Sequence, residues 1–117
     1  MTEVVLFDLK PVVEGLEQDL GISIETIAIV LEVDRRTVER WRANQTLPQG
    51  KTRERLRRLL SVRDRIHQMF GSREAGREWL QARSQYLGGF TPEEALKAGR
   101  LDRVLADLDG LAAGVYL

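Results

Sequence analysis

The sequence contains no cysteine and a single histidine, His67, in 117 residues. Disulfides, thiolate metal sites and a cysteine nucleophile are therefore excluded, and one histidine cannot build a histidine metal cluster. We find no nucleophile paired with a base and no carboxylate pair typical of a catalytic site. Residues 71–77 superficially suggest a phosphate loop but lack its lysine and its preceding strand. The sequence therefore indicates no enzyme, no cofactor and no metal.

Long apolar runs are also absent. None approaches the roughly 20 residues that span a bilayer, and the N-terminus lacks a basic region followed by an apolar block. We therefore expect a soluble, cytoplasmic protein that does not bind a membrane. With 43% hydrophobic residues in 117, the chain can build one modest core or two very small ones.

Net charge is absent as well, because 18 bases balance 18 acids, but the two signs are separated along the chain. Residues 1–33 carry one base and seven acids, a net charge of −6. Residues 34–65 carry eleven bases and four acids, a net +7, and residues 66–117 carry six bases and seven acids, a net −1. The concentration of positive charge in the middle segment favours contact with nucleic acid there.

Residues 24–43 have the apolar spacing of a helix-turn-helix. The positions that can converge on one small core are Ile27, Leu31, Val33, Val38 and Trp41. Ala28 is small enough for the two helices to cross closely, and Asp34 is a suitable N-cap for the second helix. Glu32 stands where the turn usually has glycine, so this turn must tolerate a side chain.

The second of these helices would present long cationic side chains, which reading a major groove requires. The candidate DNA-binding residues are Arg35, Arg36, Thr37, Glu39, Arg40, Arg42, Asn44, Lys51 and Arg53. We assign the last four to phosphates, and the arginines and the glutamate before them to base edges. The alternative is an ordinary helical hairpin whose arginines form a solvated face.

Helical spacing continues on both sides of this motif. The predicted helices cover residues 8–20, 24–43 with a turn inside, 52–70, 73–82, 91–98 and 101–112. Ser23 is expected to cap the helix-turn-helix, and Thr91, Pro92 and Glu94 form a strong helix start with a capping box. Since nothing in the sequence requires a sheet, the expected fold class is all-α, a helix-turn-helix region followed by a small C-terminal helical bundle.

Several groups of side chains allow two interpretations. Arginines of the long helix are a solvated face, which we favour slightly, or a flank of the DNA surface; they are Arg53, Arg57, Arg58 and Arg65. Trp79 and Tyr86 are expected in the core rather than an interface, because a chain with seven aromatics needs most of them for packing. The apolar segment 114–117 should fold back or find a partner, because a large exposed apolar side chain forgoes on the order of 1.5–3 kcal/mol.

The order of these features resembles the Xre/MbcA/ParS antitoxins. In that family an Xre-like helix-turn-helix precedes an arginine- and leucine-rich helix and a C-terminal toxin-binding domain. The matching segments are RTVERW (36–41), RERLRRLL (53–60), the tryptophan of AGREWL (Trp79), and LGGFTPEEALKAGRLDRVLADLDGLAAGVY (87–116). The resemblance covers about residues 12–117, nearly the whole chain.

This resemblance implies an antitoxin that neutralises a toxin of the RES class, which destroys NAD, and whose complex with the toxin represses its own operon. In the family the C-terminal domain docks on the toxin, and the chain end lies near the toxin's NAD pocket. The candidate toxin-binding residues are Trp79, Tyr86, Leu87, Gly89, Thr91, Pro92, Arg100, Gly114, Val115, Tyr116 and Leu117.

The expected division is a helix-turn-helix region with its long connecting helix over 1–70 and a toxin-binding domain over 71–117, sharing one core through the 52–70 helix. Because such operators are usually inverted repeats, we expect a homodimer or a toxin–antitoxin hetero-oligomer on operator DNA. The rival interpretation is a plain helix-turn-helix regulator whose C-terminal helices dimerise it or sense another protein.

Overall fold

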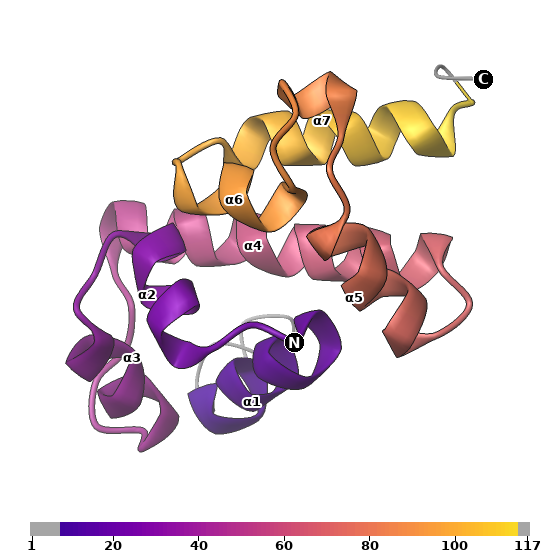
Figure 1. The fold of residues 1–117 in the computed structure, drawn as a ribbon. Helices are drawn as coiled ribbons and strands as arrows, with labels where there is room; N and C mark the ends of the chain where they lie inside the picture. Colours follow the sequence, from indigo (N-terminus) through magenta and orange to yellow (C-terminus); the bar gives the residue numbers. More distant parts are fainter. Residues whose placement is uncertain (1–7, 115–117) are drawn as a thin grey trace.

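The computed structural model describes residues 8–114, and within them the chain is helical with no strand. This confirms the prediction of an all-α fold. The elements, which Figure 1 shows in sequence colours, are α1 (Leu9–Leu20), α2 (Ile24–Leu31), α3 (Arg35–Arg42), α4 (Gly50–Met69), α5 (Arg73–Gln81), the 3-10 turn η2 (Gln85–Leu87), α6 (Pro92–Lys97) and α7 (Leu101–Ala112).

The long helix α4 runs through the middle of the molecule, with α1 to α3 on one side and α6 and α7 on the other (Figure 1). One hydrophobic cluster extends from Leu9 in α1 to Leu108 in α7. The central stripe of α4, at most 3% exposed, consists of Leu56, Leu59, Val62 and Ile66. The division at residue 70 stays a prediction, and the core runs through both regions.

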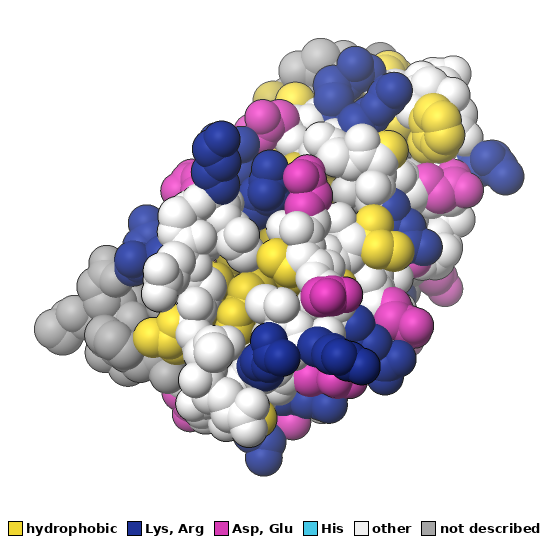
Figure 2. Space-filling model, turned by 90° about the vertical axis from the view of Figure 1, so that its left-hand side faces the viewer, with side chains coloured by type: hydrophobic (Ala, Val, Ile, Leu, Met, Phe, Trp, Pro, Cys, Tyr) yellow, Lys and Arg dark blue, Asp and Glu magenta, His cyan; other side chains and the backbone are white. Residues whose placement is uncertain are grey.

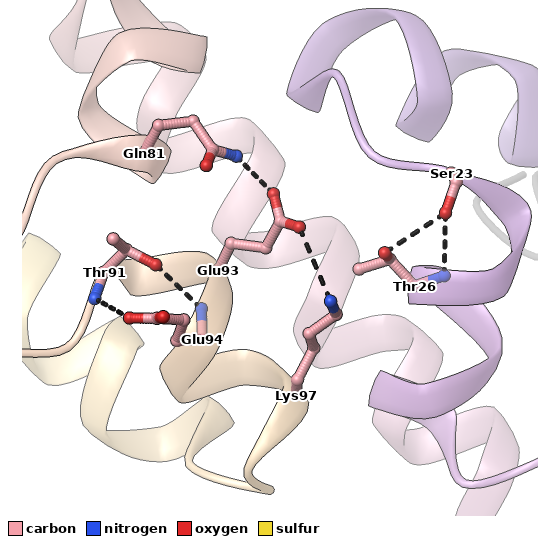
Figure 3. A network of polar contacts seen from close by, with 7 residues as sticks. All are labelled: Ser23, Thr26, Gln81, Thr91, Glu93, Glu94 and Lys97. Atoms are coloured by element: carbon pink, nitrogen blue, oxygen red, sulfur yellow. Dashed lines mark hydrogen bonds and ion pairs between the residues drawn. The ribbon is translucent and has the colours of Figure 1, made fainter.

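Helix starts follow the capping signals that the sequence carries. The Ser23 hydroxyl accepts a hydrogen bond from the Thr26 amide (3.1 Å) at the start of α2. At α6 the Thr91 hydroxyl accepts from the Glu94 amide (3.0 Å), and the Glu94 carboxylate accepts from the Thr91 amide (2.9 Å) (Figure 3). That backbone hydrogen bond stabilises the charged carboxylate and lowers the pKa of Glu94. The predicted capping box is therefore confirmed.

The start of the long helix and the burial of one residue in the last helix differ from the prediction. Helix α4 begins at Gly50 rather than Thr52, because the Arg53 amide already donates to the Gln49 carbonyl (3.3 Å). Ala112 has helical spacing with the apolar residues of the predicted 101–112 helix, which predicts burial, but it is exposed in the final turn of α7.

The aromatic residues also pack differently from expectation. Tyr86 was expected in the core but is 41% exposed, because Leu87 takes the inward position of the 3-10 turn and is only 3% exposed. Trp79 is half-buried, with its ring tilted at 37° and 6.1 Å from that of Phe70. The tight turn has only one inward position for these two adjacent large side chains, and the leucine occupies it.

Helices α4 and α5 cross at Gly76, which is buried. A Cβ atom added there would lie 2.6 Å from Cγ2 of Ile66, a buried side chain that would have to shift. Glycine at this position therefore sets how closely the two helices approach.

We expect Gly76→Ala to lower the free energy of unfolding. The clash costs about 1–3 kcal/mol, and the gain in helix propensity, about 0.5–1 kcal/mol, offsets only part of it. Gly71→Ala is the matched control, since a Cβ there meets nothing within 4 Å. Urea unfolding followed by circular dichroism measures both variants, and equal stability of the two would contradict the close crossing.

Candidate functional site

Helices α2 and α3 pack against each other, and α3 also packs on α1. Among the predicted core positions Ile27, Leu31, Val38 and Trp41 are at most 2% exposed, and Val33 is half-buried. Asp34 occupies the N-cap position of α3, although its side chain makes no capping hydrogen bond. The apolar spacing of residues 24–43 thus correctly identified the packing of this pair of helices.

Glu32 closes the turn between these helices in the left-handed conformation, with φ 60° and ψ 45°. Its amide donates to the Ile29 carbonyl (3.1 Å) and the Val33 amide donates to the Ala28 carbonyl (3.0 Å), the pattern of a Schellman motif. The Glu32 carboxylate pairs with Arg55 of α4 at 3.3 Å. The turn therefore has the geometry that glycine would provide, at the cost of a strained L residue.

The arginines of α3 fall into two groups. Arg35 pairs with Glu25 (3.5 Å) and Glu39 (3.1 Å), and Arg42 lies 3.8 Å from Glu17. Arg36 and Arg40 are exposed and form no ion pair with the part of the chain that the structure describes. Being four residues apart on one helix, they share a face. These two therefore offer the least compensated positive charge on α3.

Figure 2 shows the end of the molecule where α2, α3 and the start of α4 lie. Basic side chains are spread over this face, with acidic side chains among them, rather than gathered into one uniform patch. Lys51, at the start of α4, is exposed, while Thr37 and Arg53 are half-buried. Acidic neighbours thus weaken the electrostatic attraction that this surface would exert on DNA.

The side chain of Asn44 forms hydrogen bonds within the chain. Its Oδ1 accepts from the Leu9 amide (3.0 Å), and its Nδ2 donates to the Asp8 carboxylate (3.1 Å). Its backbone, with φ 58°, ends α3. The sequence assigned Asn44 to a phosphate, whereas the structure places its side chain over the start of α1.

The arginines on the outer face of α4 do more than cover a solvated surface, because some of them form ion pairs with another helix. Arg58 pairs with Asp102 (3.2 Å) and Arg65 pairs with Asp109 (2.8 Å), so both connect α4 to α7. On the other side of the molecule Arg77 of α5 donates to the Gln18 carbonyl at the end of α1. Arginine side chains therefore link the C-terminal helices to the rest of the fold.

The candidate toxin-binding residues separate into a structural and an exposed group. Leu87 and Pro92 are buried, and Thr91 caps α6. The exposed group includes Tyr86 and Arg100, whose guanidinium lies 5.7 Å from the centre of the Phe90 ring. The glycines Gly89 and Gly114 have left-handed φ values of 87° and 72°. Val115, Tyr116 and Leu117 lie outside the described residues.

Beside Tyr86 the surface has a hollow of about 260 Å³. Its lining consists of Trp79, Ala82, Arg83, Ser84, Gln85, Tyr86, Asp107 and Leu111. Asp107 is only 4% exposed and was missed in the sequence. The sequence does contain a signal for this burial, because Asp107 stands three residues after Val104 and four before Leu111. Its carboxylate therefore lies within an apolar stripe of the helix. This hollow is the most chemically distinctive feature of the C-terminal region.

Within residues 8–114 no group of three or more potential ligand side chains could hold a metal ion. None of the helices that the structure describes is long and apolar enough to cross a membrane.

We compared the sequence and the fold with those of known proteins. No protein-family model matches the chain. The mycobacterial cidal antitoxin MbcA is 29% identical over 109 residues, 93% of this chain and 96% of the relative, in both Mycobacterium tuberculosis and Mycobacterium bovis. A probable mycobacterial cidal antitoxin of M. tuberculosis is 28% identical over 113 residues, 94% of this chain and 92% of the relative.

The fold agrees with these similarities. A chain in the crystal structure of the M. tuberculosis MbcT–MbcA toxin–antitoxin complex superposes with a TM-score of 0.70 and 29% identity, over 93% of this chain and 97% of that one. Sequence and fold together associate the chain with small helical antitoxins and not with enzymes. Within that class the similarity is to the MbcA type, which confirms the resemblance found in the sequence.

The left-handed turn predicts the effect of changing Glu32. Glu32→Gly should raise the free energy of unfolding by about 0.5–1 kcal/mol, because glycine adopts this φ without strain. Loss of the exposed Arg55 pair subtracts less than about 1 kcal/mol. The control Glu32→Gln removes the charge and keeps the strained Cβ. Thermal unfolding compares the variants, and a glycine variant less stable than the glutamine variant would refute the strain.

Proposed function

We propose that this chain is the antitoxin of a toxin–antitoxin pair and neutralises its toxin by binding it directly. The supporting observation is the similarity, in sequence and in fold over 93% of the chain, to the antitoxin of the MbcT–MbcA complex. That similarity includes the C-terminal helices as well as the α2–α3 unit, because it covers 97% of the solved chain.

In this proposal the toxin is of the RES class and consumes NAD, and the C-terminal region of the antitoxin closes its active site. The docking residues are the exposed members of the predicted set, among them Tyr86 and Arg100. The segment 114–117 follows α7 directly and acts as the blocking segment. Buried members such as Leu87 contribute by holding the loop that presents Tyr86.

In the same proposal α3 binds the operator of the antitoxin's own operon. Arg36 and Arg40 carry uncompensated charge toward solvent, whereas Arg35 and Arg42 lie beside acidic side chains. A single α3 offers few cations, and an inverted-repeat operator offers two equivalent half-sites. A homodimer or a toxin–antitoxin hetero-oligomer is therefore the DNA-binding unit.

The alternative is a plain transcriptional regulator without a toxin. It accounts equally well for the cations of α3, because these belong to both proposals. The relatives favour the antitoxin proposal. The similarity to these antitoxins extends over nearly the whole chain and is not limited to the proposed DNA-binding region.

The double variant Arg36→Ala/Arg40→Ala should separate the two activities. DNA affinity should fall about 100-fold or more, since each well-placed arginine contributes about 1–3 kcal/mol to base recognition. Neutralisation of the toxin should be unchanged, because neither residue belongs to the toxin-binding set. Gel-shift titration with the operator region measures the first effect, and growth of cells co-expressing the toxin measures the second.

The matched control is Arg73→Ala/Lys97→Ala, which removes the same charge from α5 and α6, where Arg73 pairs with Asp19 and Lys97 pairs with Glu93. It should leave DNA binding nearly intact. The division of labour is wrong if the α3 variant, correctly folded, loses neutralisation, or if both variants lose DNA binding to the same extent.

A further inference from the structure

Three arginines converge on the loop between α5 and α6, residues 84–90, which lies beside α7 (Figure 1). Arg83 and Arg103 each donate a hydrogen bond of 3.1 Å to a backbone carbonyl of this loop. The guanidinium of Arg100 lies 5.7 Å from the centre of the Phe90 ring. We call this loop and the three arginines around it the arginine-rimmed loop.

The positive charge of these arginines remains available to a partner. All three are exposed, and none forms an ion pair with any residue between 8 and 114. A guanidinium carries five N–H donors, and the contacts to the loop carbonyls use one of them on each of two arginines. The remaining donors face solvent and are suited to carboxylate oxygens.

The carboxylates around the loop are engaged elsewhere. Glu94 accepts from the Thr91 amide (2.9 Å) in the capping box of α6. Asp102 pairs with Arg58 of α4 at 3.2 Å. Asp107 is buried and already has an interaction within the chain. The surface of the arginine-rimmed loop therefore carries net positive charge.

An exposed aromatic side chain lies at the centre of this charge. Phe90 is 43% exposed, although it belongs to a loop that is fixed by the chain itself. The Ser84 amide donates to the Phe90 carbonyl (3.0 Å), and the Gly89 amide donates to the Ser84 carbonyl (2.8 Å). A loop held in this way loses little conformational entropy on binding. Aromatic side chains and arginines are also the residues most enriched at protein–protein interfaces.

The position of the loop favours a protein partner over nucleic acid. Phosphates satisfy guanidinium groups as carboxylates do, but the loop lies on the side of α4 opposite α3. A duplex bound by α3 is therefore not beside it. The exposed ring of Phe90 is stabilised by an apolar contact, which the phosphate backbone of a duplex does not supply.

We propose that the arginine-rimmed loop binds an acidic surface of the toxin, whose carboxylates pair with Arg83, Arg100 and Arg103 around an apolar contact on Phe90. The inference rests on the proposed function, since the acidic surface belongs to the toxin. It adds Arg83, Phe90 and Arg103 to the toxin-binding residues and gives the chemistry of the surface that they contact.

The test is the affinity of the full-length chain for the purified toxin encoded by the adjacent gene, measured by surface plasmon resonance at low and at high salt. Arg100→Glu should weaken binding about 10-fold or more at low salt, because it places like charges opposite each other. The loss should shrink at high salt, which screens exposed charges. Lys10→Glu is the matched control: it makes the same charge change at an exposed residue of α1 and should change affinity less than about threefold.

A second variant tests the apolar contact instead of the charge. Phe90→Ala should weaken binding about 10-fold, as truncation of a central interface residue does, and this loss should persist at high salt. Leu47→Ala is its control, because Leu47 is 44% exposed but lies in the loop between α3 and α4. Circular dichroism confirms that each variant is folded, and the two variants alter different side chains, so one remains informative if the other fails to fold.

The identity of the bound group comes from charge exchange. Replacing one acidic residue of the toxin by arginine should restore most of the affinity that Arg100→Glu has lost. If the unmodified chain does not bind the toxin, the proposed function falls and this inference with it. If it binds, only the acidic contact is refuted by a folded variant no weaker than its control, or by the failure of every exchange. A variant that loses operator DNA in a gel shift and keeps the toxin would also refute it, because the occupant would then be nucleic acid.

Discussion

The buried stripe of α4 is the feature on which the rest of the structure depends. Leu56, Leu59, Val62 and Ile66 form one apolar line along a helix that lies between α1–α3 and α6–α7. No other described helix matches the 20 residues of α4, since α1 and α7 have 12 each, α2 and α3 have eight each and α6 has six. Short helices are marginal alone, so their stability comes from packing on α4.

The same helix connects the two surfaces to which the proposed function assigns different tasks. Arg55 of α4 reaches the turn of the α2–α3 unit through Glu32, while Arg58, one turn further on, reaches the start of α7 through Asp102. These surface pairs contribute little free energy individually. The proposed DNA-binding and toxin-binding regions lie on opposite sides of α4.

Much of the fold could be predicted from the sequence, because caps and apolar periodicity are local signals. Ser23, Thr91 and Glu94 mark helix starts that the structure confirms, and the spacing of Ile27, Leu31, Val38 and Trp41 identified a buried set. The family resemblance came from the order of such short signals and is supported by the relatives.

The features that could not be predicted depend on contacts between distant segments. Asn44 lies in a polar loop, and only the fold brings its side chain to Leu9 and Asp8, 35 and 36 residues earlier. Which arginines of α3 carry free charge depends on acids from other helices, as with Glu17 beside Arg42. Tyr86 and Leu87 compete for one inward position, and periodicity does not decide such a competition inside a single 3-10 turn.

The most direct measurement is co-expression of this chain with the protein encoded beside it, scoring growth and intracellular NAD. The neighbour alone should stop growth and drain NAD, and the full chain should restore both, whereas a chain ending at Ala113 should restore neither. A neighbour that leaves growth and NAD unchanged would contradict the antitoxin function itself. Full rescue by the shortened chain would contradict the blocking role of residues 114–117.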